Sequence, residues 1–164
     1  MISKDDLINR CSVDGAINWK QYHGEIEARR GYVQTLERIQ NEDYASRKTP
    51  DDTVAAFVKA VGYENAVVTI ATLINRSGWD GRISGKNAEW AKTIDNALDE
   101  KAAVDCDLYA DGIHMAHLDQ IADKMRKYTP ALEAAEKATN QKPGKEAAAN
   151  GRQQQRKRKS DLAR

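Results

Sequence analysis

The sequence predicts a mainly α-helical fold, a compact bundle of about five to six helices with a glycine-rich loop and a disordered basic C-terminal tail. Apolar residues recur at steps of three and four along most of the chain, which is the spacing of one helix face. Residues typical of helix ends, such as Thr49-Pro50 and Gly62, separate these segments. No alternating strand pattern accompanies them, and only Arg82–Ile83 is compatible with short strand pairing.

The first two predicted helices are delimited by capping residues and a turn. Ser3 begins a short helix that runs to Arg10, and Asp14-Gly15 predicts a turn after it. Asn18 caps a long helix that extends to residue 46. Its apolar positions form a single stripe, namely Trp19, Tyr22, Ile26, Val33, Leu36 and Ile39.

The next two predicted helices are the most apolar. Thr49 caps the first of them, and Pro50 takes the first turn, where its missing N–H does no harm. Gly62 ends that helix, and a second one covers residues 63–76. We expect the helix over 63–76 to be the central core helix, because its apolar residues are not confined to one stripe. Its apolar run is too short to cross a bilayer.

Three further helical segments are predicted in the second half of the chain. One covers residues 86–98, with Trp90, Ile94 and Leu98 along one face. A helix or helix pair covers residues 102–127, and Gly112 is its expected break. A last helix covers residues 130–138 and begins at a proline.

A change in composition divides the chain into a helical domain, residues 1–139, and a basic flexible tail, residues 140–164. The tail holds eight basic and two acidic residues, a net charge of +6, whereas residues 1–139 hold 18 basic and 23 acidic residues, a net charge of −5. The tail has almost no large apolar residue and cannot bury enough surface to fold alone. The sequence therefore predicts an acidic body with a disordered basic tail.

The cysteines and the N-terminus predict a cytoplasmic protein. Cys11 and Cys106 lie far apart and form no CxxC pattern, which favours a reducing compartment over a disulfide framework. Acidic residues stand near the N-terminus, where a signal peptide would carry basic ones.

The basic cluster of the tail is the clearest functional feature of the sequence. Such a cluster neutralises phosphates and gains affinity from released counterions. It predicts contact with DNA, RNA or a nucleoprotein through Arg152, Arg156, Lys157, Arg158 and Lys159. No aromatic residue is interleaved with these cations, so neither base stacking nor sequence reading is expected. The alternative is a solvated tail that keeps an acidic body soluble.

The loop over residues 77–85 is the second candidate site. Together with the helix that follows, it offers a partner-binding face of Trp79, Asp80, Arg82, Lys86 and Trp90. Its glycines allow close backbone approach, and a helix N-terminus with two basic side chains attracts anions. The structural alternative is a turn in which the two tryptophans pack across the corner. In that case Arg82→Ala is a cleaner functional probe than Trp79→Ala, which would unfold the corner.

A third candidate is a metal site near Cys106. His114 and His117 are three residues apart on one helix face, so both could reach one metal ion and support a metal-dependent enzyme. The pair lacks the glutamate and the four-residue spacing of a metalloprotease, and structural or surface histidines are the alternative. The sequence has no phosphate-cradling loop and no dinucleotide fingerprint. We therefore expect no cofactor and no catalytic residues.

Three blocks of the sequence, Gly62–Val68, Gly78–Ser84 and Asn87–Lys92, resemble a known family. In that family a helix leads into Trp-Asp-Gly-Arg, a hydrophobic residue and Ser, followed by Asn and a Trp-Ala-Lys helix. The segment over residues 108–128 resembles its closing helix more loosely. The family is an uncharacterised domain family of plasmids, integrative elements and prophages of Firmicutes.

The resemblance implies a phage or mobile-element setting rather than a mechanism. Small helical proteins of that setting include anti-CRISPR proteins, which occupy the nucleic-acid- or PAM-reading surface of a nuclease. We therefore expect a non-enzymatic binding protein, an anti-CRISPR-type inhibitor of a Cas nuclease–guide RNA complex such as Cas9. The alternatives are a DNA- or RNA-binding accessory protein of a plasmid or prophage, and the metal-dependent enzyme. The helix faces would also allow a homodimer, and no membrane partner is expected.

Overall fold

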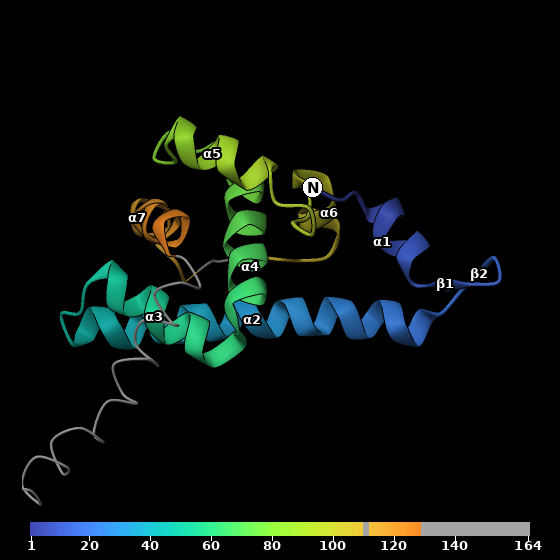
Figure 1. The fold of residues 1–164 in the computed structure, drawn as a ribbon, viewed down its shortest axis with the longest axis horizontal. Coiled ribbons are helices and arrows are strands. Elements are labelled where there is room, and N and C mark those ends of the chain that lie inside the picture. The colour runs from blue at the N-terminus through green and yellow to red at the C-terminus, as the bar shows by residue number, and fades with distance from the viewer. Residues whose placement is uncertain (110–111, 129–164) are drawn as a thin grey trace, which may run out of the picture. The chain divides into compact units, whose positions relative to one another are not determined.

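The computed structural model describes residues 1–109 and 112–128, and within them it confirms the mainly helical fold (Figure 1). The described elements are α1 (Lys4–Arg10), β1 (Ser12–Val13), β2 (Ala16–Ile17), α2 (Trp19–Ala45), α3 (Pro50–Val61), α4 (Tyr63–Arg76), α5 (Gly85–Lys92), α6 (Glu100–Asp105) and α7 (Met115–Lys127). The helix expected over 130–138 and the basic tail lie outside the described residues.

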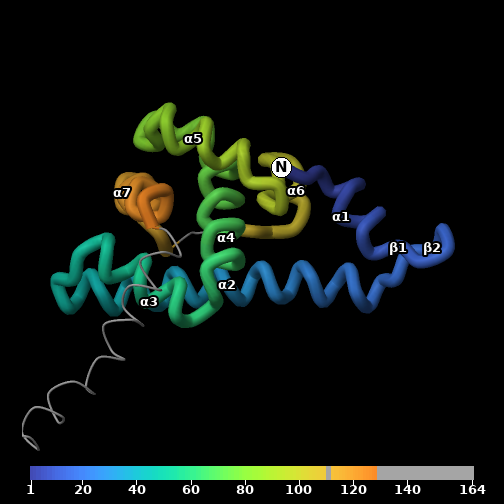
Figure 2. Tube along the Cα trace, in the orientation of Figure 1, coloured from blue at the N-terminus to red at the C-terminus, as the bar shows by residue number. Residues whose placement is uncertain are grey.

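Helix α4 is central, as its apolar composition predicts. It contacts α2, α3, α5, α6 and α7. It runs from the long helix α2 toward α5, and its crossing with α2 is clear in the tube view (Figure 2). All residues from Thr69 to Ile74 are buried, which explains why this helix is apolar around most of its circumference.

The helix boundaries follow from local sequence signals. Ser3 and Thr49 each cap a helix by a reciprocal pair of hydrogen bonds with an aspartate three residues later. Gly62 ends α3 with a φ of +88°, a conformation that favours glycine, and α4 begins at the next residue. The axes of α3 and α4 consequently differ by 120°.

The core of the unit Met1–Lys127 has two parts. Helices α2, α3, α4 and α7 bury the largest side chains between them, including Leu36, Phe57, Ile70, Leu118 and Met125. A second cluster joins α1, α6 and the first half of α2, and it contains Ile2, Leu7, Cys11, Tyr22, Ile26, Leu98, Ala102, Ala103, Cys106 and Leu108. Both cysteines are buried free thiols within this second cluster.

The prediction of a helix over residues 86–98 is wrong at its C-terminal end. Helix α5 stops at Lys92, and the chain then runs past the N-terminal segment. Ile2 donates to the carbonyl oxygen of Ala97 (2.7 Å) and accepts from the N–H of Asp99 (2.9 Å), forming an isolated parallel bridge with Leu98. This non-local pairing competes with helix continuation, and the local periodicity does not encode it.

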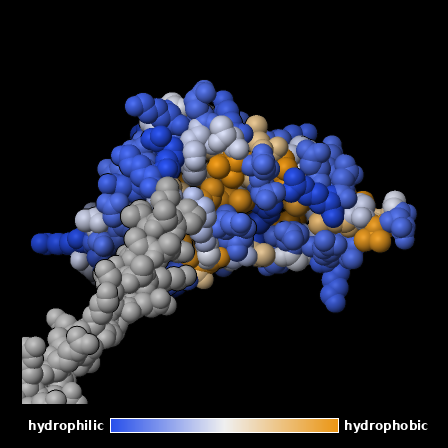
Figure 3. Space-filling view, viewed as in Figure 1, coloured by the Kyte–Doolittle hydropathy of each residue, from blue (hydrophilic) through white to orange (hydrophobic). Residues whose placement is uncertain are grey.

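A short hairpin joins α1 to α2, at the Asp14-Gly15 turn and not at Arg82–Ile83. Asp14 and Gly15 have φ values of +52° and +78°, which is the geometry of a tight two-residue hairpin turn. Its strands have two residues each, too few to show an alternating pattern. Val13 and Ile17 are exposed, and they give this end of the molecule an apolar surface (Figure 3).

Trp19 does not belong to the buried stripe of α2. The other five apolar positions predicted for that stripe are buried, whereas Trp19 is 55% exposed. Its indole lies edge-on against Tyr22, with ring centroids 5.9 Å apart, beyond the end of the core.

Within the part of the chain that the structure describes, no single helix combines the length and hydropathy needed to cross a membrane. The bent pair of α3 and α4 reaches both values only when the two helices are taken together.

Candidate functional site

The sequence-predicted loop forms a corner between α4 and α5, here called the Trp79 corner and defined as residues 77–90. Its fold is fixed by Asp80, whose carboxylate faces inward and is only 8% exposed. Asp80 accepts from Nε of Arg82 at Oδ1 (2.9 Å) and from Nη2 at Oδ2 (2.7 Å). Oδ1 also accepts from the backbone N–H of Arg82 (2.9 Å). Three hydrogen bonds therefore close the turn within three residues.

These bonds set the electrostatics of the corner. The Arg82 guanidinium and its backbone N–H hold the pKa of Asp80 at about 2, below its ordinary value of 3.8. The same pairing raises the pKa of Arg82. The nearby charge of His114 acts on Asp80 in the same direction as Arg82 does. The two charges of the turn neutralise one another, and Lys86 remains exposed on the first turn of α5.

A second set of hydrogen bonds anchors the corner to α7 through Asn87. Its side chain is fully buried, and its amide donates to the backbone oxygen of Asp119 (2.9 Å) and to that residue's Oδ1 (2.7 Å). Arg126 donates from Nε to Oδ1 of Asn87 (2.7 Å). The N–H of Ser84 donates to the same carboxylate oxygen of Asp119 (2.8 Å). The start of α5 is therefore fixed on α7 by the side chains of Asn87, Asp119 and Arg126.

Trp79 stands on this anchored loop with its indole in solvent. The residue is 76% exposed, whereas Trp90 on α5 is half-buried. The expectation that the two tryptophans pack across the corner is therefore wrong. Asp80 and Arg82, and not the tryptophans, hold the turn together. Trp79→Ala is therefore a cleaner test of function than Arg82→Ala, the reverse of the expectation from the sequence. Trp79→Ala leaves the turn intact, and Arg82→Ala removes its main internal partner.

The five predicted residues of the loop face lie together at this corner because they are near neighbours in sequence. Lys86 and Trp79 are its exposed members, Arg82 is half-exposed through its side chain, and Asp80 is buried. The predicted tail residues Arg152, Arg156, Lys157, Arg158 and Lys159 lie outside the described residues.

The residues proposed for a metal site have different surroundings. Cys106 is buried in the second core cluster, where burial raises the pKa of its thiol and Tyr22 is its hydrogen-bond partner. His114 is exposed near Asp80, and His117 is partly buried within reach of the Asp43 charge. Over residues 1–109 and 112–128, no group of three His, Cys, Asp or Glu side chains is arranged to hold a metal ion.

Sequence reasoning missed the residues that position the corner. In the sequence, Asn87 is only the first residue of the Asn87–Lys92 block. Asp119 and Arg126 are charged residues of a predicted helix, of the kind that usually faces solvent. The signal available was an asparagine in the first turn of a helix that already has a serine cap, where a second capping residue is not needed. Its partners lie 32 and 39 residues away, so no local pattern reveals them.

Comparison with known proteins places these features in a family. A family model described as "Protein of unknown function (DUF3849)" matches residues 17–130. The chain belongs to this family. The match confirms the expectation of an uncharacterised domain family, and the DUF3849 region contains the whole Trp79 corner together with α2, α3 and α7. No curated protein and no solved structure matches the chain.

Proposed function

We propose that this DUF3849 protein acts by binding a macromolecular partner through the Trp79 corner, with Trp79 as the central contact. The observation that carries the proposal is the 76% exposure of Trp79 on a loop fixed from below by Asp80 and Asn87. Tryptophan is enriched among residues that dominate binding energy at interfaces. A rigid platform lowers the conformational entropy lost when such a side chain is immobilised.

The partner we propose is a nucleoprotein, specifically a guide-RNA-loaded Cas nuclease that the protein inhibits. Two considerations support this choice. The resemblance in the Trp-Asp-Gly-Arg region implies a mobile-element setting, in which inhibitors of such nucleases occur. The charge separation suits a composite target, because the acidic body matches a basic nucleic-acid channel and the basic tail matches RNA or DNA.

The test measures target-DNA cleavage by a panel of guide-loaded Cas9 enzymes with full-length protein in excess. We expect slower cleavage by at least one enzyme, and an affinity for that complex about tenfold or more weaker for Trp79→Ala, because a hot-spot aromatic contributes about 2 kcal/mol or more. Tyr44→Ala is the matched control. Tyr44 is also a highly exposed aromatic residue, at 83%, but it lies near the end of α2. This control is expected to keep wild-type inhibition.

The alternative, direct binding to nucleic acid through the tail, is separated by fluorescence anisotropy with labelled DNA and RNA across several salt concentrations. The variant for this arm replaces Arg156, Lys157, Arg158 and Lys159 by glutamine in the full-length chain. Binding of the wild type that weakens steeply with salt and disappears in this variant would favour an accessory nucleic-acid-binding protein. Unchanged cleavage across the panel, or equal inhibition by wild type and Trp79→Ala, would contradict the proposal.

A further inference from the structure

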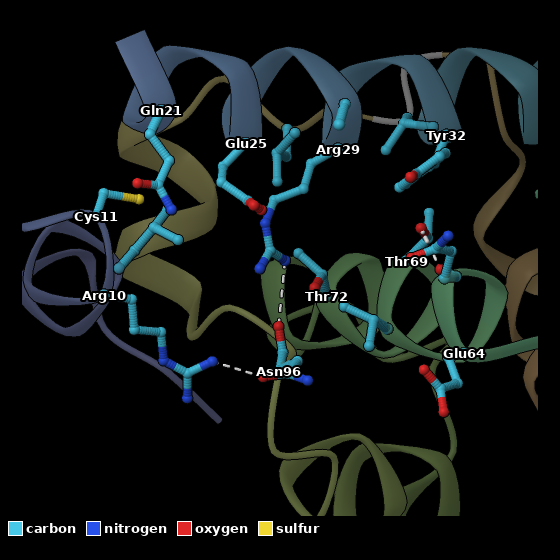
Figure 4. A pocket seen from close by; sticks show the side chains of 16 residues that line it. Arg10, Cys11, Gln21, Glu25, Arg29, Tyr32, Glu64, Thr69, Thr72 and Asn96 are labelled. Carbon is cyan, nitrogen blue, oxygen red and sulfur yellow. Dashed lines mark hydrogen bonds between the residues drawn. The ribbon is translucent and has the colours of Figure 1, made fainter. Parts of the chain in front are cut away.

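A hollow of about 410 Å³ lies between α1, α2 and α4, within the unit Met1–Lys127 (Figure 4). This volume is in the range of small-molecule sites. Two arginines line the hollow, Arg10 at the end of α1 and Arg29 on α2. The Trp79 corner contributes none of its lining residues.

Both arginines are fixed on Asn96. Nη1 of Arg10 donates to the side-chain Oδ1 of Asn96 (2.6 Å), and Nη1 of Arg29 donates to its backbone oxygen (3.1 Å). In Figure 4 the Arg29 side chain extends from α2 into the middle of the hollow, and Arg10 approaches Asn96 from the side of α1. Three segments of the chain thus bring two positive charges to one place.

The charge of Arg29 is incompletely compensated. Its Nε is buried and has no hydrogen-bond partner within the described residues. Neither guanidinium forms an ion pair with a carboxylate of those residues. Burial lowers the pKa of Arg29, the Glu25 carboxylate opposes that shift, and the Arg10 charge adds to it. Arg29 is partly buried, and a buried N–H without an acceptor is costly to maintain, so an anionic ligand would supply the missing acceptor.

The other residues that line the hollow limit which chemical groups the anionic ligand can have. Tyr32 and Thr69 line the far half of the hollow, with Glu64 on the same side (Figure 4). Glu25 and Glu64 bring two carboxylates to a site with two arginines, so the charges of the lining side chains sum to zero. A compact polyanion would be repelled by these carboxylates, whereas hydroxyl or ammonium groups of a ligand would donate hydrogen bonds to them.

We propose that this hollow binds a small organic acid with one oxyanion group, held by Arg10 and Arg29, and with hydrogen-bond donors that face Glu25 and Glu64. An α-amino acid and a sugar phosphate both meet this description. The site is independent of the partner proposed for the Trp79 corner.

The experiment is isothermal titration calorimetry on the full-length protein at low ionic strength, with three probes. These are an equimolar mixture of the common amino acids, a mixture of glucose 6-phosphate and ribose 5-phosphate, and inorganic phosphate alone. We expect saturable binding at up to millimolar concentration in one of the organic arms, and the responding arm identifies the oxyanion as carboxylate or phosphate. Inorganic phosphate should bind more weakly because it leaves the two carboxylates without donors.

Arg10→Gln and Arg29→Gln are each expected to raise the dissociation constant about tenfold or more, since each removes a charge-assisted hydrogen bond. Arg10 is exposed, so its variant tests the site even if replacing the more buried Arg29 disturbs folding. Arg38→Gln, at an exposed position of the same helix, and Trp79→Ala should both bind as the wild type does. Absence of saturable binding in all three arms, or equal binding by wild type and both Arg10 and Arg29 variants, would overturn the proposal.

Discussion

The carboxylate of Asp80 accepts two parallel hydrogen bonds, of 2.9 Å and 2.7 Å, from the guanidinium of Arg82, which lies two residues later in the chain. This bidentate pair folds the loop back on itself and leaves the preceding indole of Trp79 in solvent. Asp80 and Arg82 therefore maintain the shape of the loop, and Trp79 provides its exposed aromatic side chain. Because different residues have these two roles, single substitutions can test each role separately.

The first prediction concerns stability at the corner. Trp79→Ala is expected to change the free energy of unfolding by no more than about 0.5 kcal/mol, because an exposed side chain loses little burial. Arg82→Ala is expected to lower the stability clearly, because it leaves the inward-facing Asp80 carboxylate without its main partner. Urea denaturation followed by circular dichroism measures both. A larger loss for Trp79→Ala than for Arg82→Ala would contradict the assignment of roles.

The second prediction concerns acid stability. Because the pKa of Asp80 is lowered to about 2 in the folded protein, its contribution is fully present above the unfolded-state value near 3.8. That contribution is lost as the pH falls from about 4 to 2. Asp80→Asn and Arg82→Gln should both make stability less dependent on pH over this window. The measurement is the denaturation midpoint at a series of pH values. If the midpoint falls with pH as steeply in both variants as in the wild type, the prediction is wrong.

The third prediction concerns the link between α5 and α7. Asn87→Ala should lower the free energy of unfolding by about 2–3 kcal/mol, because it removes a fully buried side chain and its three hydrogen bonds to Asp119 and Arg126. Asn9→Ala, at an exposed position of α1, is the control and should have a much smaller effect. Equal denaturation curves for the two variants would show that the network does not stabilise the corner.

The fourth prediction concerns His117 on α7. Burial is the main cause that lowers its pKa below the ordinary value of 6.5, the His114 charge adds to the shift, and the Asp43 charge opposes it. A histidine that is harder to protonate in the folded state destabilises the fold as the pH falls below about 6.5. His117→Gln should therefore reduce the loss of stability between about pH 7 and pH 5.

His23→Gln is the matched control for this measurement, because His23 is exposed and the variant retains His117. This variant should keep the wild-type pH dependence of stability, measured by thermal denaturation at pH 7 and at pH 5. If His117→Gln keeps that dependence as well, another group is responsible for it.

Much of the fold could be predicted from the sequence because its determinants are local. Ser3, Asn18, Thr49 and Ser84 all cap helices in the structure through side-chain hydrogen bonds to nearby N–H groups. The break between α3 and α4 at Gly62 follows from one residue with a positive φ. Contacts within four residues are encoded by spacing alone, and these elements were identified correctly for that reason.

The candidate site was predicted only in part. The loop residues could be chosen because Trp-Asp-Gly-Arg is a distinctive local sequence, but their roles could not be assigned. Whether Trp79 is buried or exposed depends on what α7 and α4 place beneath the loop. The arginine hollow had no sequence signal at all, since Arg10 and Arg29 lie 86 and 67 residues from Asn96.

The sequence by itself determined the helical class, most helix starts, the central position of α4 and the charge separation between body and tail. Each of these depends on composition or on neighbours within one or two helical turns. Only the tertiary structure decided that α5 ends at Lys92, that Asn87 joins α7, and that two arginines converge on Asn96. These features depend on backbone and side-chain hydrogen bonds between distant segments, whose geometry exists only once the helices have packed.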